Sequence, residues 1–452
     1  MTRDALADDL ARAVTEQYAS LPANGKPRPR TNGSPTWTVL AGFCLYRTRD
    51  EHVEAQCISI GTGLKALPHS KLPLHGDVLH DSHAEVIARR GLKLWLYDEL
   101  AAAIRCARTA FLKRRDNGTW RLRDEWELGL WISTLPCGDA STYSLSLAAP
   151  ASAPSQSLHP QNLDSHSNMH RSLTEGAALG MVTTRDGPTM TSSDSNLNTP
   201  LVHRGRVSYS SFSTLRTKPG RADSPPTTSH SCSDKIAMWS LLGIQGGLLA
   251  TLGVHVELSF IGISGVKGDE TEKEKIRDEV TRAVGGRLDG WEGPREKRVR
   301  VPAVGLADRV DFSHSRESVA AAYDVAEEEV VSCQESLSWI RSIGTEVITN
   351  GVRQGASPKR KTGEPLGPKA RSRLSKLSQF QRRLEVERLE LQNQASDRLS
   401  YYDAKRPSNS SHTSSDEYQS LKAAVREGPF RGWLVSGEEW ESFNGQGHVS
   451  SS

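Results

Sequence analysis

The chain of 452 residues lacks several features that would restrict its class. It has no apolar run of about 18 residues, so we predict no membrane-spanning helix. It has only six cysteines, in unrelated contexts, which argues against a disulfide framework and favours reduced thiols. Residues 1–19 are polar and charged, without the apolar stretch of a signal peptide. We therefore expect a monomeric protein of the cytoplasm, the nucleus or both.

One segment of the chain has few residues that could form a core. Residues 148–200 contain no Phe, Trp, Tyr, Ile, Cys or Lys, while Ser, Thr, Asn and Pro dominate. A segment with so little apolar surface cannot offset the entropy lost on ordering. We therefore predict a disordered insertion over residues 148–200.

The rest of the chain alternates strand and helix patterns. Residues 1–35 predict an N-terminal helix (5–19) and a Pro/Gly-rich connector, and residues 36–452 predict one large domain interrupted by the insertion. Further strands and helices are expected in this order: strands 37–46 and 53–60, a helix from 83 to about 105, a strand 128–134 and a helix 236–252. This order predicts an α/β fold.

Three separated fragments carry the chemistry. They are His83-Ala84-Glu85, Pro136-Cys137 and Ser231-Cys232. One imidazole and two thiolates would give Zn²⁺ three protein ligands and leave a fourth position open for water. Both cysteines are predicted at helix starts, where the helix dipole favours a thiolate. Glu85, close to His83 but not a ligand, is the candidate general acid and base.

Taken singly, each of these residues is ordinary. A lone His-x-Glu is most often a surface pair, and a lone Cys is most often an inert buried thiol. A structural zinc site is an alternative, although three ligands beside a Glu favour catalysis. The wide spacing between Cys137 and Cys232 also differs from the tight Pro-Cys-x-x-Cys turn of small cytidine and bacterial tRNA deaminases.

The strings around these residues resemble the adenosine deaminases acting on RNA, and within them the eukaryotic tRNA-specific branch. They are residues 81–90 (DSHAEVIARR), 215–221 (LRTKPGR) and 231–237 (SCSDKIA), and the similarity runs from residues 37–43 to residues 417–419 and 432–433. The resemblance implies a zinc-dependent deaminase fold, with a central mixed sheet flanked by helices and a C-terminal helical extension that encloses an inositol phosphate.

The resemblance also implies a second cofactor. Members of this family bury inositol hexakisphosphate, which is tolerable only among cations and hydrogen-bond donors. The matching positions in this chain are Lys65, Arg89, Arg90, Lys235, Trp239, Gln245, Lys376, Tyr418, Lys422 and Trp433. Asp81 and Lys218 match residues that link this cofactor to the zinc site. Met238 and His80 depart from the family, which often has Arg and Asn at these positions.

The implied reaction is hydrolytic deamination of adenosine to inosine in tRNA, at position thirty-seven, 3′ of the anticodon of tRNA-Ala. Two alternatives are a deaminase of double-stranded RNA in messages and a catalytically dead RNA-binding relative. No separate double-stranded RNA-binding domain fits in the sequence, and all four site residues are present. Basic stretches at 295–300 and 353–373 are predicted to contact RNA, although such loops are often simply solvated.

We predict that a short Gly/Ser linker can replace residues 148–200 with little loss of folding or deamination, because the entropy of loop closure changes slowly with length. Thermal unfolding, zinc content and activity of the shortened protein test this. Aggregation or loss of zinc would show that the segment packs against the domain.

Overall fold

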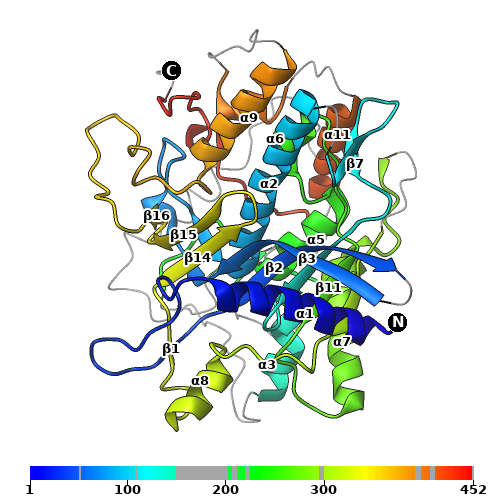
Figure 1. The fold of residues 1–452 in the computed structure, drawn as a ribbon, viewed down its shortest axis with the longest axis vertical. Coiled ribbons are helices and arrows are strands. Elements are labelled where there is room, and N and C mark those ends of the chain that lie inside the picture. The colour runs from blue at the N-terminus through cyan, green and yellow to red at the C-terminus, as the bar shows by residue number, and fades with distance from the viewer. Residues whose placement is uncertain are drawn as a thin grey trace, which may run out of the picture.

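The computed structural model describes residues 1–49, 52–106, 109–148, 202–205, 211–218, 224–294, 300–391, 399–407 and 413–449. It has a mixed α/β architecture, in which helices flank a central eight-stranded sheet (Figure 1). Among the described residues, no helix combines the length and apolar character needed to cross a membrane. The predicted insertion lies outside the described residues except for Ala148.

The central sheet contains parallel and antiparallel pairs. Its strand order is β12-β11-β8-β2-β3-β14-β15-β16, with β8, β11 and β12 parallel and the other pairs antiparallel. The strands are β2 (Leu40–Arg49), β3 (His52–Thr62), β8 (Glu127–Ile132), β11 (Phe260–Ile263), β12 (Ala303–Leu306), β14 (Glu335–Ile340), β15 (Gly344–Thr349) and β16 (Val352–Arg353). The predicted strands 37–46, 53–60 and 128–134 correspond to β1–β2, β3 and β8.

Short paired strands lie outside this sheet. They are β1 (Thr36–Trp37) with β13 (Val331–Ser332), β4 (Leu64–Ala66) with β5 (Asp81–His83), β6 (Leu112–Arg114) with β7 (Trp120–Leu122), and β9 (Val202–Arg204) with β10 (Leu215–Thr217).

The main helices are α1 (Arg3–Ser20), α2 (Ala84–Cys106), α3 (Thr142–Ala148), α5 (Cys232–Leu242), α6 (Gly246–Ala250), α7 (Glu270–Gly285), α8 (Arg316–Tyr323), α9 (Lys376–Glu390), α10 (Tyr401–Ala404) and α11 (Thr413–Glu427). Short 3-10 turns are η1 (His69–Lys71), η2 (Asp139–Ser141), η3 (Gly286–Leu288) and η5 (Glu438–Trp440).

Strand β2 divides its side chains between two cores, because successive residues of a strand point to opposite faces. Ala41, Phe43 and Leu45 join the large core with α2, whereas Leu40 and Cys44 join the core under α1. Figure 1 shows α1 lying across one face of the sheet. The N-terminal helix, confirmed as α1, therefore covers one face of the sheet, while α2 packs against the other face.

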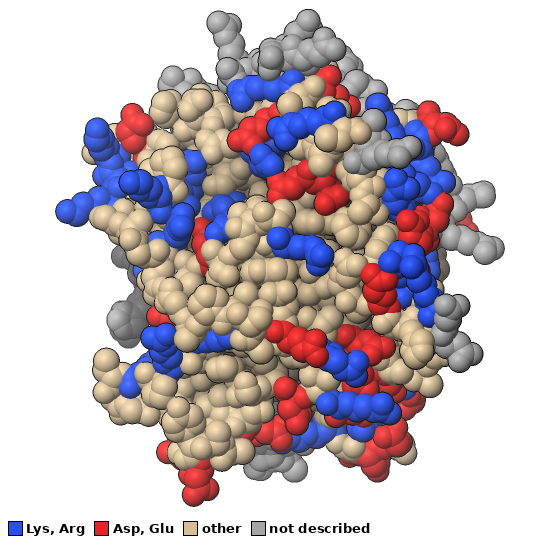
Figure 2. Space-filling model, viewed as in Figure 1, with Lys and Arg blue, Asp and Glu red and all other residues tan. Residues whose placement is uncertain are grey.

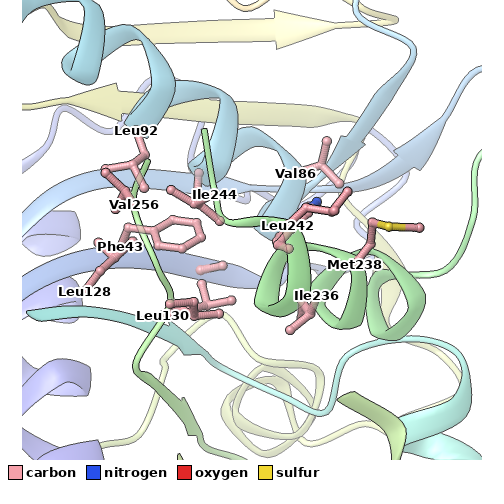
Figure 3. Close-up of a cluster of buried hydrophobic side chains, with 14 of the residues drawn as sticks. Phe43, Val86, Leu92, Leu128, Leu130, Ile236, Met238, Leu242, Ile244 and Val256 are labelled. Atoms are coloured by element: carbon pink, nitrogen blue, oxygen red, sulfur yellow. The ribbon is translucent and has the colours of Figure 1, made fainter. Parts of the chain in front are cut away.

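The large core joins α2 and α5 to the sheet. Figure 3 shows Phe43 from β2 and Leu128 from β8 in one cluster with Leu92 of α2 and Ile236 of α5. Every labelled side chain in this cluster is less than one tenth exposed. Apolar packing of this kind is the main term that fixes one element against another.

Two predicted helices differ from the structure. The single helix expected over 236–252 is two helices, α5 and α6, which break at Gly243. Gly243 has φ +83°, and a Cβ atom there would lie 2.3 Å from the side-chain oxygen of Gln245. Cys137 does not begin a helix, because Gly138 follows with φ +104° before the short turn η2.

Helix α2 lies directly on β3 at Gly61. A Cβ atom at Gly61 would lie 2.3 Å from the carbonyl oxygen of Ala84 and 2.6 Å from the amide nitrogen of Ala88. Both atoms are backbone atoms and cannot rotate away. The absence of a side chain at Gly61 therefore determines how closely the first turn of α2, which carries Glu85, approaches the sheet.

We predict that Gly61→Ala lowers the free energy of unfolding by about 3 kcal/mol, at the upper end of the usual cost of overpacking, because backbone atoms must move. Gly367→Ala is the matched control, since a Cβ atom there meets nothing within 4 Å. Denaturant unfolding compares the two variants. Equal midpoints would contradict the close packing of α2 on β3.

Candidate active site

The segment Asp81–Glu85 joins a strand to a helix. Strand β5 ends at His83, and Glu85 lies in the first turn of α2. Glu85 is only 3% exposed. Burial raises the pKa of Glu85, and the neighbouring Cys137 raises it further. A raised pKa makes a carboxyl group a better proton acceptor, as a general acid and base must be.

The two cysteines come from separate loops that touch. Ser231 caps α5 by accepting a hydrogen bond from the amide of Asp234 at 3.2 Å, and Cys232 is the first residue of that helix. The amide of Cys232 donates to Cys137 Sγ at 3.3 Å. Gly138 permits this approach, since a Cβ atom there would lie 2.2 Å from Ser231 Oγ.

The four predicted residues meet in one place. Cys232 Sγ lies 3.2 Å from Glu85 Oε2. Side-chain hydrogen bonds link His83 to Cys137 and Cys137 to Cys232. Among the residues that the structure describes, no three His, Cys, Asp or Glu side chains form a ready metal-binding group. The residues are neighbours, but their side chains are hydrogen-bonded to one another.

Asp81 connects the residues of this site through its two carboxylate oxygens. Its Oδ1 accepts hydrogen bonds from the amide of His83 at 3.0 Å and from His83 Nδ1 at 2.9 Å. Its Oδ2 accepts from Lys218 Nζ at 2.8 Å, from Ser229 Oγ at 2.6 Å and from Lys235 Nζ. Because Nδ1 of His83 is held by Asp81, Nε2 is the nitrogen that would bind a metal.

Charge in the site favours the thiolate at Cys137, whereas burial and Cys137 raise the pKa of Cys232 well above its usual value. Lys218 is 3% exposed, and its Nζ lies 3.2 Å from Cys232 Sγ. A hydrogen bond from Cys232 holds the pKa of Cys137 well below its usual value, and Lys218 lowers it further, despite burial. Burial and Lys218 would lower the pKa of His83, but Asp81 and Cys137 raise it to about 9. Two thiols and an oriented imidazole are a donor set that fits zinc.

The model of the adenosine-deaminase (editase) domain family matches residues 59–436. The chain belongs to this family. Every residue of the site described above falls within the matched range.

Individual relatives are similar over different lengths. The tRNA-specific adenosine deaminase 1 of Saccharomyces cerevisiae is 32% identical over 240 residues, which cover 52% of this chain and 53% of that protein. The mouse protein of the same name is 28% identical over 451 residues, covering 83% of this chain and 86% of the relative. The double-stranded RNA-specific editase Adar of Drosophila melanogaster is 28% identical over 63% of this chain and 36% of its own length.

Two cavities lie near Asp81. They have volumes of about 280 and 210 Å³ and share Arg89, Arg90, Trp239 and Trp433 in their walls. Asp81 lines the larger cavity, and so it links the cavity to His83. Eight of the residues predicted to bind the inositol phosphate line one or both cavities: Arg89, Arg90, Lys235, Trp239, Lys376, Tyr418, Lys422 and Trp433.

Two of the residues predicted to bind the inositol phosphate, Lys65 and Gln245, line neither cavity. Lys65 donates from Nζ to Ser332 Oγ at 2.7 Å. Gln245 accepts from the amide of Val256 at 3.1 Å and donates to the carbonyl of Leu242 at 2.8 Å. The side chain of Gln245 therefore stabilises the turn between α5 and α6.

Three cations of the smaller cavity are missing from the sequence prediction. They are Lys93, Lys405 and Arg426. Lys93 follows Arg89 by four residues, so both lie on one face of α2. That spacing is the signal that could have identified Lys93. Lys405 and Arg426 come from separate C-terminal segments, and no local pattern in the sequence places them beside α2.

The smaller cavity is strongly cationic. Six cations line it, and no Asp or Glu is among the described residues in its wall. Burial lowers the pKa of Lys93 well below its usual value, and Arg89 and Arg90 lower it further. Burial also lowers the pKa of Lys405 to about 8, although Glu441, 2.6 Å away, opposes this. Buried cations repel one another unless an anion lies between them, so the cavity fits a polyanion.

The two departures from the family pattern add no charge. Met238 lines the smaller cavity with an apolar side chain. His80 lines the larger cavity, and its Nε2 lies 3.0 Å from the carbonyl oxygen of Leu67. Burial lowers the pKa of His80 to about 4, so the ring is neutral near pH 7. Lys93 and its cationic neighbours therefore supply the positive charge.

We predict that Lys422→Glu prevents stable folding, because the new carboxylate would face a bound polyanion. Lys275→Glu on the exposed side of α7 is the control. If the cavity holds no anion, Lys422→Glu would instead stabilise the fold, because the new carboxylate would attract Lys405 and Arg426. Burial and the positive charges of these two residues lower the pKa of Lys422 in the parent protein. Thermal unfolding separates the outcomes, and a soluble variant more stable than the parent would contradict the polyanion.

Proposed function

We propose that this protein is a zinc-dependent deaminase that converts adenosine to inosine in tRNA. The observation that carries the proposal is the meeting of buried Glu85 with His83, Cys137 and Cys232. Membership of the adenosine-deaminase (editase) domain family supports it.

In this proposal, His83 and the thiolates of Cys137 and Cys232 would hold the zinc ion. When bound, zinc supplies the activation of water at neutral pH. Asp81 orients the imidazole of His83 through Nδ1, and Lys218 stabilises the thiolate of Cys232. These residues position the donor atoms before any substrate arrives.

Glu85 moves the protons. The oxygen of water adds to C6 of a flipped-out adenine, and ammonia leaves, so the product is inosine. Glu85 takes the proton released by the attacking water and delivers protons to the ring and to the departing amine. The raised pKa of Glu85 suits both directions of transfer, since the group gains and loses a proton within one cycle.

The names of the relatives support tRNA as the substrate class. We propose the adenosine at position thirty-seven of tRNA-Ala, as the family resemblance implies. An exposed basic surface is formed by Arg353, Lys359, Lys361 and Lys369 in and after β16. Figure 2 shows blue side chains at the left edge of the molecule, where Figure 1 draws the loop after β16. This surface would attract the phosphate backbone.

We propose inositol hexakisphosphate as the polyanion of the two cavities. Lys235, Lys376 and Lys422 would face its phosphates, together with Lys93 and Lys405, which line the same cavities. Its release on denaturation, measured as phosphorus by elemental analysis alongside zinc, tests both cofactors in one sample.

We predict that Glu85→Gln retains zinc but loses deamination by roughly 10²–10⁴-fold, because the amide cannot transfer protons. Glu346→Gln is a control matched for burial, since Glu346 is 3% exposed, its pKa is raised by burial, and it contacts Ser372 rather than a thiol. Inosine in a tRNA-Ala anticodon arm and the zinc content are measured. Near-normal turnover by Glu85→Gln would sink the mechanism.

The same assay decides the substrate. The parent protein is given the tRNA-Ala anticodon arm in the whole tRNA and an RNA duplex without the tRNA body. Preference for the whole tRNA supports the proposal. Preference for the plain duplex would instead favour editing of double-stranded RNA, the activity that the name of the Drosophila relative states.

A further inference from the structure

The two cysteine loops carry the same additional residue. Asp139 follows Cys137 by two positions, and Asp234 follows Cys232 by two positions. Their side chains are 1% and 0% exposed. Nη2 of Arg287 lies within 3.7 Å of Asp139 Oδ2 and 2.8 Å of Asp234 Oδ1, so the two buried carboxylates lie close together. Such a pair needs a shared cation.

Arg287 supplies that cation. It belongs to η3, is 5% exposed, and places Nη2 at 2.8 Å from Asp234 Oδ1 and 3.7 Å from Asp139 Oδ2. Arg282 of α7 adds a contact from Nη1 to Asp139 Oδ2 at 3.0 Å. One guanidinium therefore joins the two loops on which the cysteines lie.

The same carboxylates also hold a third segment. The amide of Ser213 donates to Asp139 at 3.1 Å, and the amide of Arg216 donates to Asp234 at 2.8 Å. Arg287 donates to the carbonyl of Thr214 at 2.6 Å. Two residues after Arg216 comes Lys218, whose ammonium lies beside Cys232 Sγ. The contacts of Arg287 thus extend to the segment that presents Lys218.

We propose that Arg287 is a positioning residue, which sets the separation of Cys137 and Cys232 by binding Asp139 and Asp234 together. We name these two aspartates and Arg287 the cysteine clamp. The function of the clamp rests on the zinc site proposed above, but the clamp itself is a property of the protein without metal.

If Arg287 had only a structural role, its replacement would have a different effect. The guanidinium also lies 5.6 Å from the ring of Phe430, and its loss could lower stability everywhere. The test therefore needs a second cysteine pair as an internal reference. Cys44 and Cys57 provide it, because they face each other on β2 and β3 and their side chains are hydrogen-bonded.

The variants are Arg287→Met, which removes the charge, and Arg287→Lys, which keeps one. Arg309→Met is the control for the loss of an arginine–aspartate pair at the surface, because Arg309 is exposed and pairs with a buried aspartate, Asp8, at 3.6 Å. Transfer of zinc to a chelator is timed for each protein. The metal-free proteins are then treated with oxidised glutathione, and the Cys137–Cys232 and Cys44–Cys57 disulfides are followed by peptide mass mapping.

For Arg287→Met we expect zinc transfer to be about 10-fold to 100-fold faster, the usual effect of losing an outer contact of a metal site. We expect the Cys137–Cys232 disulfide to form several-fold more slowly relative to Cys44–Cys57, because disulfide geometry tolerates little separation. Arg287→Lys should fall between, and Arg309→Met should match the parent.

Unchanged zinc transfer and an unchanged disulfide ratio in both Arg287 variants would overturn the clamp. Equal slowing of both disulfides would also overturn it, because that result indicates general loss of structure. A parent protein without zinc would refute the proposed metal site, and the disulfide ratio would then decide the clamp alone. Arg287→Lys serves as the test protein where Arg287→Met does not fold.

Discussion

The carboxylate of Asp81 is the interaction on which the rest of the site depends. One of its oxygens orients His83, and the other binds Lys218 and Lys235. Lys218 continues to Cys232, and Lys235 lines the larger cavity. Burial alone would raise the pKa of Asp81, but the surrounding cations hold it well below its usual value. The surrounding cations therefore favour the carboxylate form of Asp81, and Asp81 connects the cavity with the thiols.

Charge also determines how the helices around the cavities pack. The polar side chains of α2 that line the cavities are cations, so the hydrophobic effect does not stabilise this part of the interface. Glu441 neutralises part of the charge by binding Lys376, Lys405 and Arg406. We propose that the polyanion neutralises the rest. In this proposal, electrostatics would hold together a region where most domains rely on apolar packing.

The sequence predicted those parts that local patterns determine. The helix over residues 5–19 and the strands of the central sheet follow from periodicity, and α1, β2, β3 and β8 confirm them. The family match confirms the resemblance. The side chains of His83, Glu85, Cys137 and Cys232 lie close together, and their roles as zinc ligands and proton carrier stay a prediction.

The rest depended on three-dimensional contacts. The break at Gly243 follows from how Gln245 bonds Val256, a contact that no spacing indicates. The same bond holds Gln245 away from the two cavities, where the resemblance had placed it. Lys405 and Arg426 reach the smaller cavity only because the C-terminal helices fold back. Arg287 is remote in sequence from both cysteines, so no motif could join it to them.

The origin of the cavity walls has a consequence for how the protein is made. Arg89 and Arg90 lie far before Lys422, Arg426 and Trp433 in the sequence, so they leave the ribosome much earlier. The wall of the cavity cannot be complete until this later segment has been synthesised. The proposed polyanion would therefore meet its full set of ligands only after the C-terminal helices have docked. Its residence time would then report the local stability of that region.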